Sequence, residues 1–235
     1  MKKLIDRCKK ASNYLLPYDS TLIVSVNNKD FMRRISNKGF PVSRSITNIF
    51  AKSAMYICEH VEGVALAYVH DDYMYLLMNK SEVAYDGAIQ NMVSVIASMA
   101  TNIFNKLLFE QSNAPSIYDA VMQREYQAAK YYQVNERQTI LNEMFNSLFI
   151  VNVFPVPEYA VIDIFSYLQE ECCCRVQRRY LHAHGVRIDD VEEQLKETLW
   201  HELHQAYRQG FYVCNQNGQE DLRMDKWRIS LEPFW

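Results

Sequence analysis

Two short apolar runs separated by three polar residues constrain the fold more than any other feature of this chain. Residues 64–69 and 73–78 read VALAYV and YMYLLM, and His70, Asp71 and Asp72 between them suit a tight turn. The spacing predicts a β-hairpin with two adjacent carboxylates at its tip. These acids either serve the turn alone, where aspartate is common and solvated, or mark a functional site between buried strands.

The segments around the hairpin complete an alternating pattern of strands and helices. STLIVSV at 20–26 predicts a strand buried on both faces, and 43–61 has the apolar spacing of a helix. A second helix is expected up to about residue 110. SLFIVNVFPVP at 147–157 predicts a strand stopped by its two prolines, and the helical pattern of 158–181 follows it.

The order β-α-β-β-α-insert-β-α is the split βαβ pattern. It predicts an α+β fold, with a ferredoxin-like antiparallel sheet and helices packed on one face, as in the palm of many polymerases and nucleotide cyclases. The 235 residues suit one compact domain. Within it, 1–110 would form the first part of the palm, 111–146 a helical insertion, and 147–235 the last palm strand and C-terminal helices. Those last residues include a helix over about 189–208 and a strand near Trp227.

In such a palm the first strand ends beside the turn of the hairpin, so residue 27 should lie near Asp71 and Asp72. Two-metal nucleotidyl transfer draws carboxylates from both places, because one ion activates the attacking hydroxyl and the other holds the triphosphate. Here the first strand ends in SVNNKDF, and Asn27 holds the expected acid position. An amide binds Mg²⁺ more weakly than a carboxylate does. Asn27 and Asn28 also suit a helix cap.

Four segments carry a resemblance to a known family. SVNNKDF at 25–31 is similar to R-L-D-G-R-N-F, and HDDYMY at 70–75 is similar to S-D-E-Y-S-F. The segment 149–169 retains the proline, aspartate and glutamine of a third motif, and HEL at 201–203 is similar to N-E-L. In this order and spacing the chain resembles the tRNA(His) guanylyltransferases and their Thg1-like relatives, which add nucleotides to RNA 5′ ends in the 3′-to-5′ direction.

The resemblance implies a metal site of Asp71, Asp72 and Asn27, with Mg²⁺ as the ion and Asn27 as a weakened ligand at the position of the family's first aspartate. It further implies GTP or ATP as substrate, the 5′ end of a tRNA or another RNA as acceptor, and a homo-oligomer, since related enzymes are tetramers.

Departures from the family motifs affect the phosphate-binding positions. No lysine directly precedes Pro41, so Lys29, Lys38 and Arg44 would neutralise the triphosphate, with His70 at the edge of the site. The family's basic patch after the hairpin aligns with YDGAIQN, which has no positive charge. The H-I-N-N element that accompanies tRNA(His) specificity is replaced by CCCRV, which favours 5′-end repair over addition of the extra guanosine.

Three arginines on one predicted helix, Arg175, Arg178 and Arg179, form either a solvated face or a contact with RNA phosphates. The net charge of −3 excludes a uniformly basic nucleic-acid binder. His201 and His204 are three residues apart, whereas a zinc hydrolase of the H-E-x-x-H type needs four.

Six cysteines, three of them consecutive, indicate reduced thiols rather than a disulfide framework. With no secretory signal and no long uninterrupted apolar run, we expect a cytoplasmic protein without a membrane partner.

Two functions follow from these residues. The first is a divergent nucleotidyltransferase of the 3′-to-5′ type. The second is a catalytically degenerate palm, without its first metal carboxylate, that binds nucleotide, RNA or a protein partner.

Overall fold

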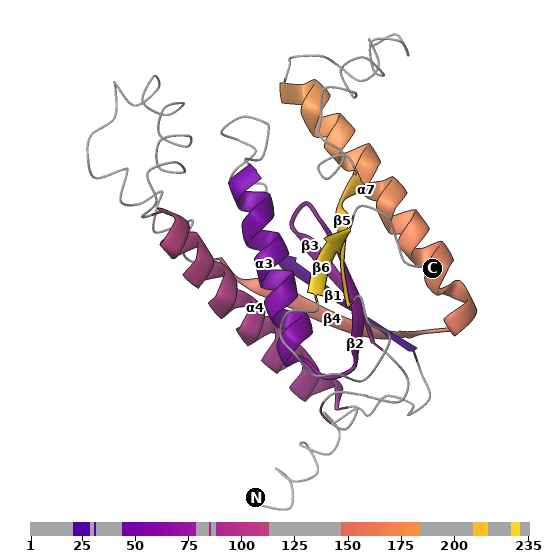
Figure 1. Cartoon of the computed structure of the whole chain (residues 1–235). Helices are drawn as coiled ribbons and strands as arrows, with labels where there is room; N and C mark the ends of the chain where they lie inside the picture. The colour runs from indigo at the N-terminus through magenta and orange to yellow at the C-terminus, as the bar shows by residue number, and fades with distance from the viewer. Residues whose placement is uncertain are drawn as a thin grey trace, which may run out of the picture.

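The described residues form a six-stranded antiparallel sheet with the strand order β4-β1-β3-β2-β5-β6 (Figure 1). The computed structural model describes residues 21–28, 31, 44–78, 85, 88–112, 147–183, 209–215 and 227–230. The strands are β1 (Thr21–Asn28), β2 (Val64–His70), β3 (Tyr73–Met78), β4 (Phe149–Val156), β5 (Phe211–Asn215) and β6 (Trp227–Ser230). The predicted α+β palm with its central hairpin is confirmed.

Strand β1, which lies between β4 and β3, is buried on both faces, as its continuous apolar run predicts. It pairs with β3 on one side and with β4 on the other. Leu22, Ile23 and Val24 are fully buried, with Ile23 facing the opposite side of the sheet from its two neighbours. The strand continues two residues beyond the predicted end, which places Asn27 and Asn28 within the sheet.

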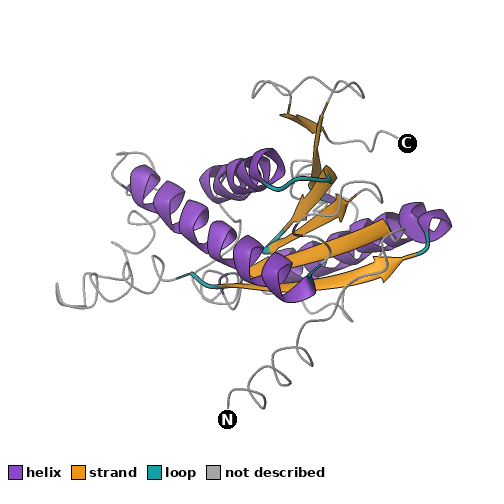
Figure 2. Ribbon diagram, turned by 90° about the horizontal axis from the view of Figure 1, so that it is seen from below, coloured by secondary structure: helices purple, strands orange, loops and turns teal. Residues whose placement is uncertain are grey.

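Helices cover both faces of the sheet, so the expectation that they pack on one face is wrong. Helices α3 (Arg44–His60) and α4 (Ile89–Ser112) pack on the face of Leu22 and Val24. Helix α7 (Val161–Ala183), preceded by the short helix η3 (Glu158–Ala160), packs on the face of Ile23 (Figure 2). Strands with apolar residues on both faces leave a second surface that also has to be covered.

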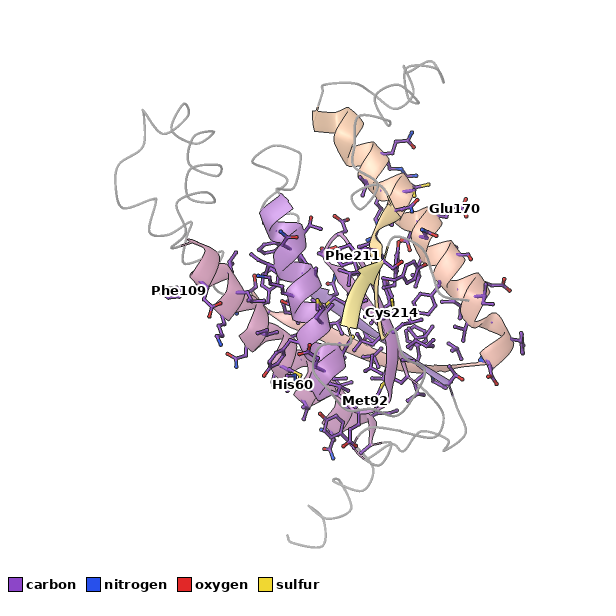
Figure 3. The ribbon with its side chains drawn as sticks, viewed as in Figure 1. His60, Met92, Phe109, Glu170, Phe211 and Cys214 are labelled. Carbon is purple, nitrogen blue, oxygen red and sulfur yellow. The ribbon has the colours of Figure 1, made fainter. Side chains whose placement is uncertain are left out.

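The larger core lies between α3, α4 and the sheet. Figure 3 shows side chains filling this space, while Phe109 and Glu170 point outward from α4 and α7. Met92, Ile96, Ala100 and Phe104 recur every four residues on α4 and are fully buried in this core.

Among the described helices only α4, over Ile89–Glu110, is long and apolar enough to cross a membrane by length and composition. Its buried stripe against α3 and the sheet is the packing of a core helix.

The edge strand β4 differs from the prediction at its prolines. Pro155 does not stop the strand, which continues to Val156 and pairs Pro155 with Leu22. Proline is tolerated on an edge strand, because the missing N–H can lie on the side without a neighbour.

The C-terminal part of the sheet was predicted only in part. The strand near Trp227 is confirmed as β6, whereas β5 was not predicted. The expected helix over 189–208 lies outside the described residues, as does the expected insertion at 111–146 apart from the end of α4.

Candidate functional site

The end of β1 is hydrogen-bonded to the tip of the β2–β3 hairpin. The backbone N–H of Asn28 donates to the carbonyl oxygen of Asp72 at 2.9 Å, and Asn27 Nδ2 donates to the same oxygen at 3.5 Å. Asn27 stands opposite Tyr73 in the strand register. The predicted meeting of residue 27 with the hairpin acids is therefore confirmed.

The hairpin acids are less solvated than an ordinary surface turn. Asp71 has a φ of 57°, in the left-handed region that aspartate tolerates better than most residues. Both aspartates are only partly exposed, and one carboxylate oxygen of each, Asp71 Oδ2 and Asp72 Oδ1, is buried. The turn geometry explains why aspartate fits here, but burial of carboxylate oxygens requires a favourable local charge environment.

Helix α7 places a cation beside these acids. Arg175 Nη2 lies 3.3 Å from His70 Nδ1 and 3.4 Å from His70 Nε2. The guanidinium carbon lies 4.9 Å from the centre of the Tyr73 ring, in cation–π contact. His70 directly precedes the acid pair and Tyr73 directly follows it, so Arg175 contacts the residue on each side of the two acids.

The charges around Arg175 reinforce this placement. Burial lowers the pKa of the guanidinium, but the nearby carboxylates of Asp71, Glu171 and Asp72 outweigh it and raise the pKa. Because a guanidinium only donates hydrogen bonds, the His70 ring nitrogen that accepts from it must carry a lone pair. We name Asn27, His70, Asp71, Asp72, Tyr73 and Arg175 together the hairpin site.

Aromatic rings support the hairpin site from the α7 face. The rings of Tyr73 and Tyr75 stack with centres 5.7 Å apart, and the His70 ring lies 5.7 Å and 5.6 Å from them. Burial raises the pKa of Tyr75 to about 12, so its hydroxyl stays protonated at neutral pH. Behind them the Tyr68 hydroxyl donates to the carbonyl oxygen of Gln209 at 2.6 Å. This stacking fixes the two strands next to the acids.

The model of the family described as tRNAHis guanylyltransferase, Thg1, matches residues 5–147. This chain belongs to the Thg1 family. No curated protein matches it in sequence.

Solved structures of Thg1 proteins share its fold. A bacterial tRNA(His) guanylyltransferase (Thg1)-like protein in complex with ATP has a TM-score of 0.73 and 17% identity, and covers 99% of this chain and 92% of its own. Such a protein in complex with GTP has a TM-score of 0.67 and 16% identity, with coverages of 99% and 91%. The tRNA(His) guanylyltransferase of Saccharomyces cerevisiae has a TM-score of 0.58 and 10% identity, with coverages of 86% and 88%.

The remaining residues predicted to bind triphosphate or RNA are placed only in part. Lys29 and Lys38 lie outside the described residues, and Arg44 is the first residue of α3. On α7, Arg178 is exposed, whereas Arg175 is turned toward the hairpin. Arg179 belongs to the same helix. Their roles toward triphosphate and RNA stay predictions.

Sequence reasoning missed the contact between Arg175 and the hairpin. The sequence assigned Arg175 to the same surface as Arg178, because nothing local shows which turn of a helix crosses a distant hairpin. Strand alternation would have placed His70 and Tyr73 on the face that α7 covers, and this was the available signal.

The chemistry of the hairpin site fits a hard divalent cation. Asp71, Asp72 and the Asn27 amide offer oxygen donors only, which Mg²⁺ prefers. The part of the chain that the structure describes contains no cluster of three or more histidine, cysteine, aspartate or glutamate ligands. The predicted donors therefore comprise two carboxylates and one amide, and the Arg175 guanidinium lies beside them.

Proposed function

We propose that this Thg1-family protein transfers nucleotides from a nucleoside triphosphate to RNA 5′ ends in the 3′-to-5′ direction. The observation that carries the proposal is the hydrogen bond between Asn28 and Asp72, since it joins the end of β1 to the acid hairpin as a palm active site requires. The Thg1-like structures in complex with ATP and with GTP support a nucleoside triphosphate as substrate.

Each residue of the site has a role that follows from its chemistry. Asp71 and Asp72 would hold Mg²⁺, with the Asn27 amide as a weaker donor. The cation, when bound, supplies charge neutralisation at the triphosphate and lowers the pKa of the attacking hydroxyl. Lys29, Lys38 and Arg44 would neutralise phosphates, and the buried ring of His70 borders the acids.

The acceptor that we propose is a 5′-truncated tRNA or another RNA rather than complete tRNA(His). CCCRV at 172–176 stands in place of the H-I-N-N element, and Cys172 and Val176 within it are buried. Side chains packed inside the protein are poorly suited to reading an anticodon or an acceptor end. Arg178 and Arg179 would contact RNA phosphates. We place this activity in the cytoplasm, in a homo-oligomer such as a tetramer.

An incorporation assay tests the proposal. Purified protein is incubated with Mg²⁺, labelled GTP or ATP and 5′-truncated tRNA. We expect incorporation by the natural chain, a gain of about tenfold or more with Asn27→Asp, and a loss of at least about a hundredfold with Asp71→Asn, since a metal carboxylate contributes several kcal/mol at the transition state.

The matched control is Glu110→Gln, which removes an exposed carboxylate of α4 that is not part of the hairpin site, and it should leave incorporation unchanged. Absence of incorporation by both the natural chain and Asn27→Asp, at high protein concentration, would refute the catalytic proposal.

The second candidate, a palm that binds nucleotide or RNA without turnover, is favoured by one observation. An amide stands at the first acid position, and Arg175 lies beside the two acids that remain. Binding of GTP or RNA by a protein that shows no incorporation, even with Asn27→Asp, would establish this candidate instead.

A further inference from the structure

Arg175 occupies an unusual place for an arginine of a surface helix. Its side chain is only 24% exposed. Its Nη2 atom lies 3.3 Å from His70 Nδ1, and its guanidinium carbon lies 4.9 Å from the Tyr73 ring centre. Since His70 and Tyr73 flank Asp71 and Asp72 in the hairpin, this guanidinium contacts the residues on both sides of the acid pair, and the charges of both acids act on it.

Pairing within α7 does not account for this placement. The partner of Arg175 on its own helix is Glu171, with 4.0 Å between Arg175 Nε and Glu171 Oε1 and 41% of the glutamate side chain exposed. An i,i+4 pair of that geometry contributes little in water. It would also leave the guanidinium in solvent, as for Arg178, rather than against buried His70.

Arg175 interacts electrostatically with the two acids of the hairpin. Asp71 and Asp72 each bury a carboxylate oxygen, and the negative charges of both act on Arg175. Charges interact more strongly in a partly buried site than in water, because the effective dielectric constant is lower. A guanidinium stays charged at every physiological pH, so the acids face a permanent cation.

We propose that Arg175 is a resident cation of the hairpin acids, which competes electrostatically with a divalent metal ion for Asp71 and Asp72. Divalent cations then bind this chain more weakly than its carboxylates alone would allow. Arg175 and Asn27 act in the same direction, since one adds a positive charge to the site and the other removes a negative one. The inference rests on the site of the proposed function, but concerns cation affinity rather than turnover.

Direct Mn²⁺ binding tests this inference without RNA or nucleotide. Free Mn²⁺ is followed by electron paramagnetic resonance during titration of the full chain. We expect Arg175→Gln to bind Mn²⁺ about tenfold more tightly than the natural chain, and Arg175→Lys, which keeps the charge, to stay close to it. The control Arg178→Gln removes the same charge from the same helix one turn further on, at an exposed position, and should change the affinity less than about twofold.

A double substitution locates the effect. Adding Asp71→Asn to Arg175→Gln should abolish the gain in Mn²⁺ affinity if the ion binds at the hairpin. Arg175→Met keeps the packing of the side-chain stem on Tyr73 without charge, and replaces Arg175→Gln if the latter does not fold, as judged by circular dichroism. Unchanged or weaker Mn²⁺ binding by an uncharged residue at position 175, or an equal gain with Arg178→Gln, would overturn the inference.

The two proposals fail in distinguishable ways. Tighter Mn²⁺ binding by Arg175→Gln without any incorporation, even with Asn27→Asp, would support the resident cation and refute the catalytic function. Incorporation by the natural chain, together with a Mn²⁺ affinity that does not change when Arg175 is replaced, would support the catalytic function and refute the resident cation.

Discussion

The two faces of the sheet carry side chains of different chemistry. The face under α3 and α4 buries an apolar core in which the rings of Phe31, Phe50, Phe104 and Phe149 lie with centres 4.8 to 6.4 Å apart. The face under α7 buries a smaller cluster that includes Tyr68, Tyr75 and Tyr212, and adjoins His70 and Arg175. The first face resembles an ordinary core, and the second combines packing with hydrogen bonding and charge.

This difference indicates that the two faces of the sheet contribute to the protein in different ways. Apolar burial supplies most of the stability of a domain, whereas tyrosine, histidine and arginine can pack and still present polar atoms. Because β1 and β3 alternate between the faces, each residue step at the hairpin passes from one environment to the other. The acids at the tip are therefore supported by the apolar face of the sheet, whereas the polar face determines the charges around them.

Truncation of a buried phenylalanine should have the largest effect, and the effect should differ between the two faces. Phe104 and Phe165 are both fully buried, but Phe104 has three phenylalanine rings around it, whereas the Tyr68 ring lies 6.3 Å from Phe165. We expect Phe104→Ala to lower the free energy of unfolding by about 4–5 kcal/mol and Phe165→Ala by about 3 kcal/mol, because the smaller cluster relaxes more easily around a cavity. Urea denaturation monitored by circular dichroism measures both.

Exposed Phe109 on α4 provides the control, and Phe109→Ala should change the unfolding free energy by less than about 0.5 kcal/mol. Equal losses for Phe104→Ala and Phe165→Ala would show that the two faces contribute alike to the free energy of unfolding.

Gly210 lies where the start of β5 packs closely against β2 of the hairpin. Its φ is +75°, and a Cβ atom there would lie 2.6 Å from the Val69 carbonyl oxygen and 2.9 Å from His70 Cβ. We expect Gly210→Ala to lower the free energy of unfolding by about 2–3 kcal/mol, since backbone strain and a clash with backbone act together. Thermal unfolding followed by circular dichroism measures the loss.

Gly63→Ala is the matched control, because Gly63 has a φ of 82° and tests the strain of the left-handed backbone by itself. A loss for Gly63→Ala as large as that for Gly210→Ala would contradict a specific contribution from close packing against Val69 and His70.

The sequence predicted the parts of the site that local pattern determines. Alternation and turn residues located the hairpin, and the split βαβ order brought Asn27 to Asp72. The same patterns could not show that Arg175 reaches the hairpin, because its approach depends on how α7 crosses the sheet. They also missed β5, a strand of five residues that follows Gly210 and has no alternation long enough to identify. The extended conformation of β5 is determined by its pairing with β2 rather than by the intrinsic strand preference of its residues.

The smallest predicted effect is a pH dependence that separates the faces. Burial, and then the charge of Asp71, raise the pKa of the Cys172 thiol on α7 to about 12. A thiol with a raised pKa in the folded state contributes stability that is fully present below its unfolded pKa, near 9, and is lost as the pH rises toward 12. We expect the free energy of unfolding of the natural chain, measured by urea denaturation, to fall between pH 8 and pH 10. For Cys172→Ala this fall should be smaller by about 1 kcal/mol.

The exposed Cys174 is the control, and Cys174→Ala should keep the pH dependence of the natural chain. The effect of Cys172 should become smaller in the presence of Asp71→Asn, because the largest charge that raises its pKa is then removed. Cys58 on α3 has its pKa raised chiefly by burial, with Glu59 and Cys214 as further causes, so its contribution should not respond to Asp71→Asn. A Cys172 contribution that is also indifferent to Asp71 would mean that the charge of the hairpin does not reach the α7 face, and that the two faces differ in packing alone.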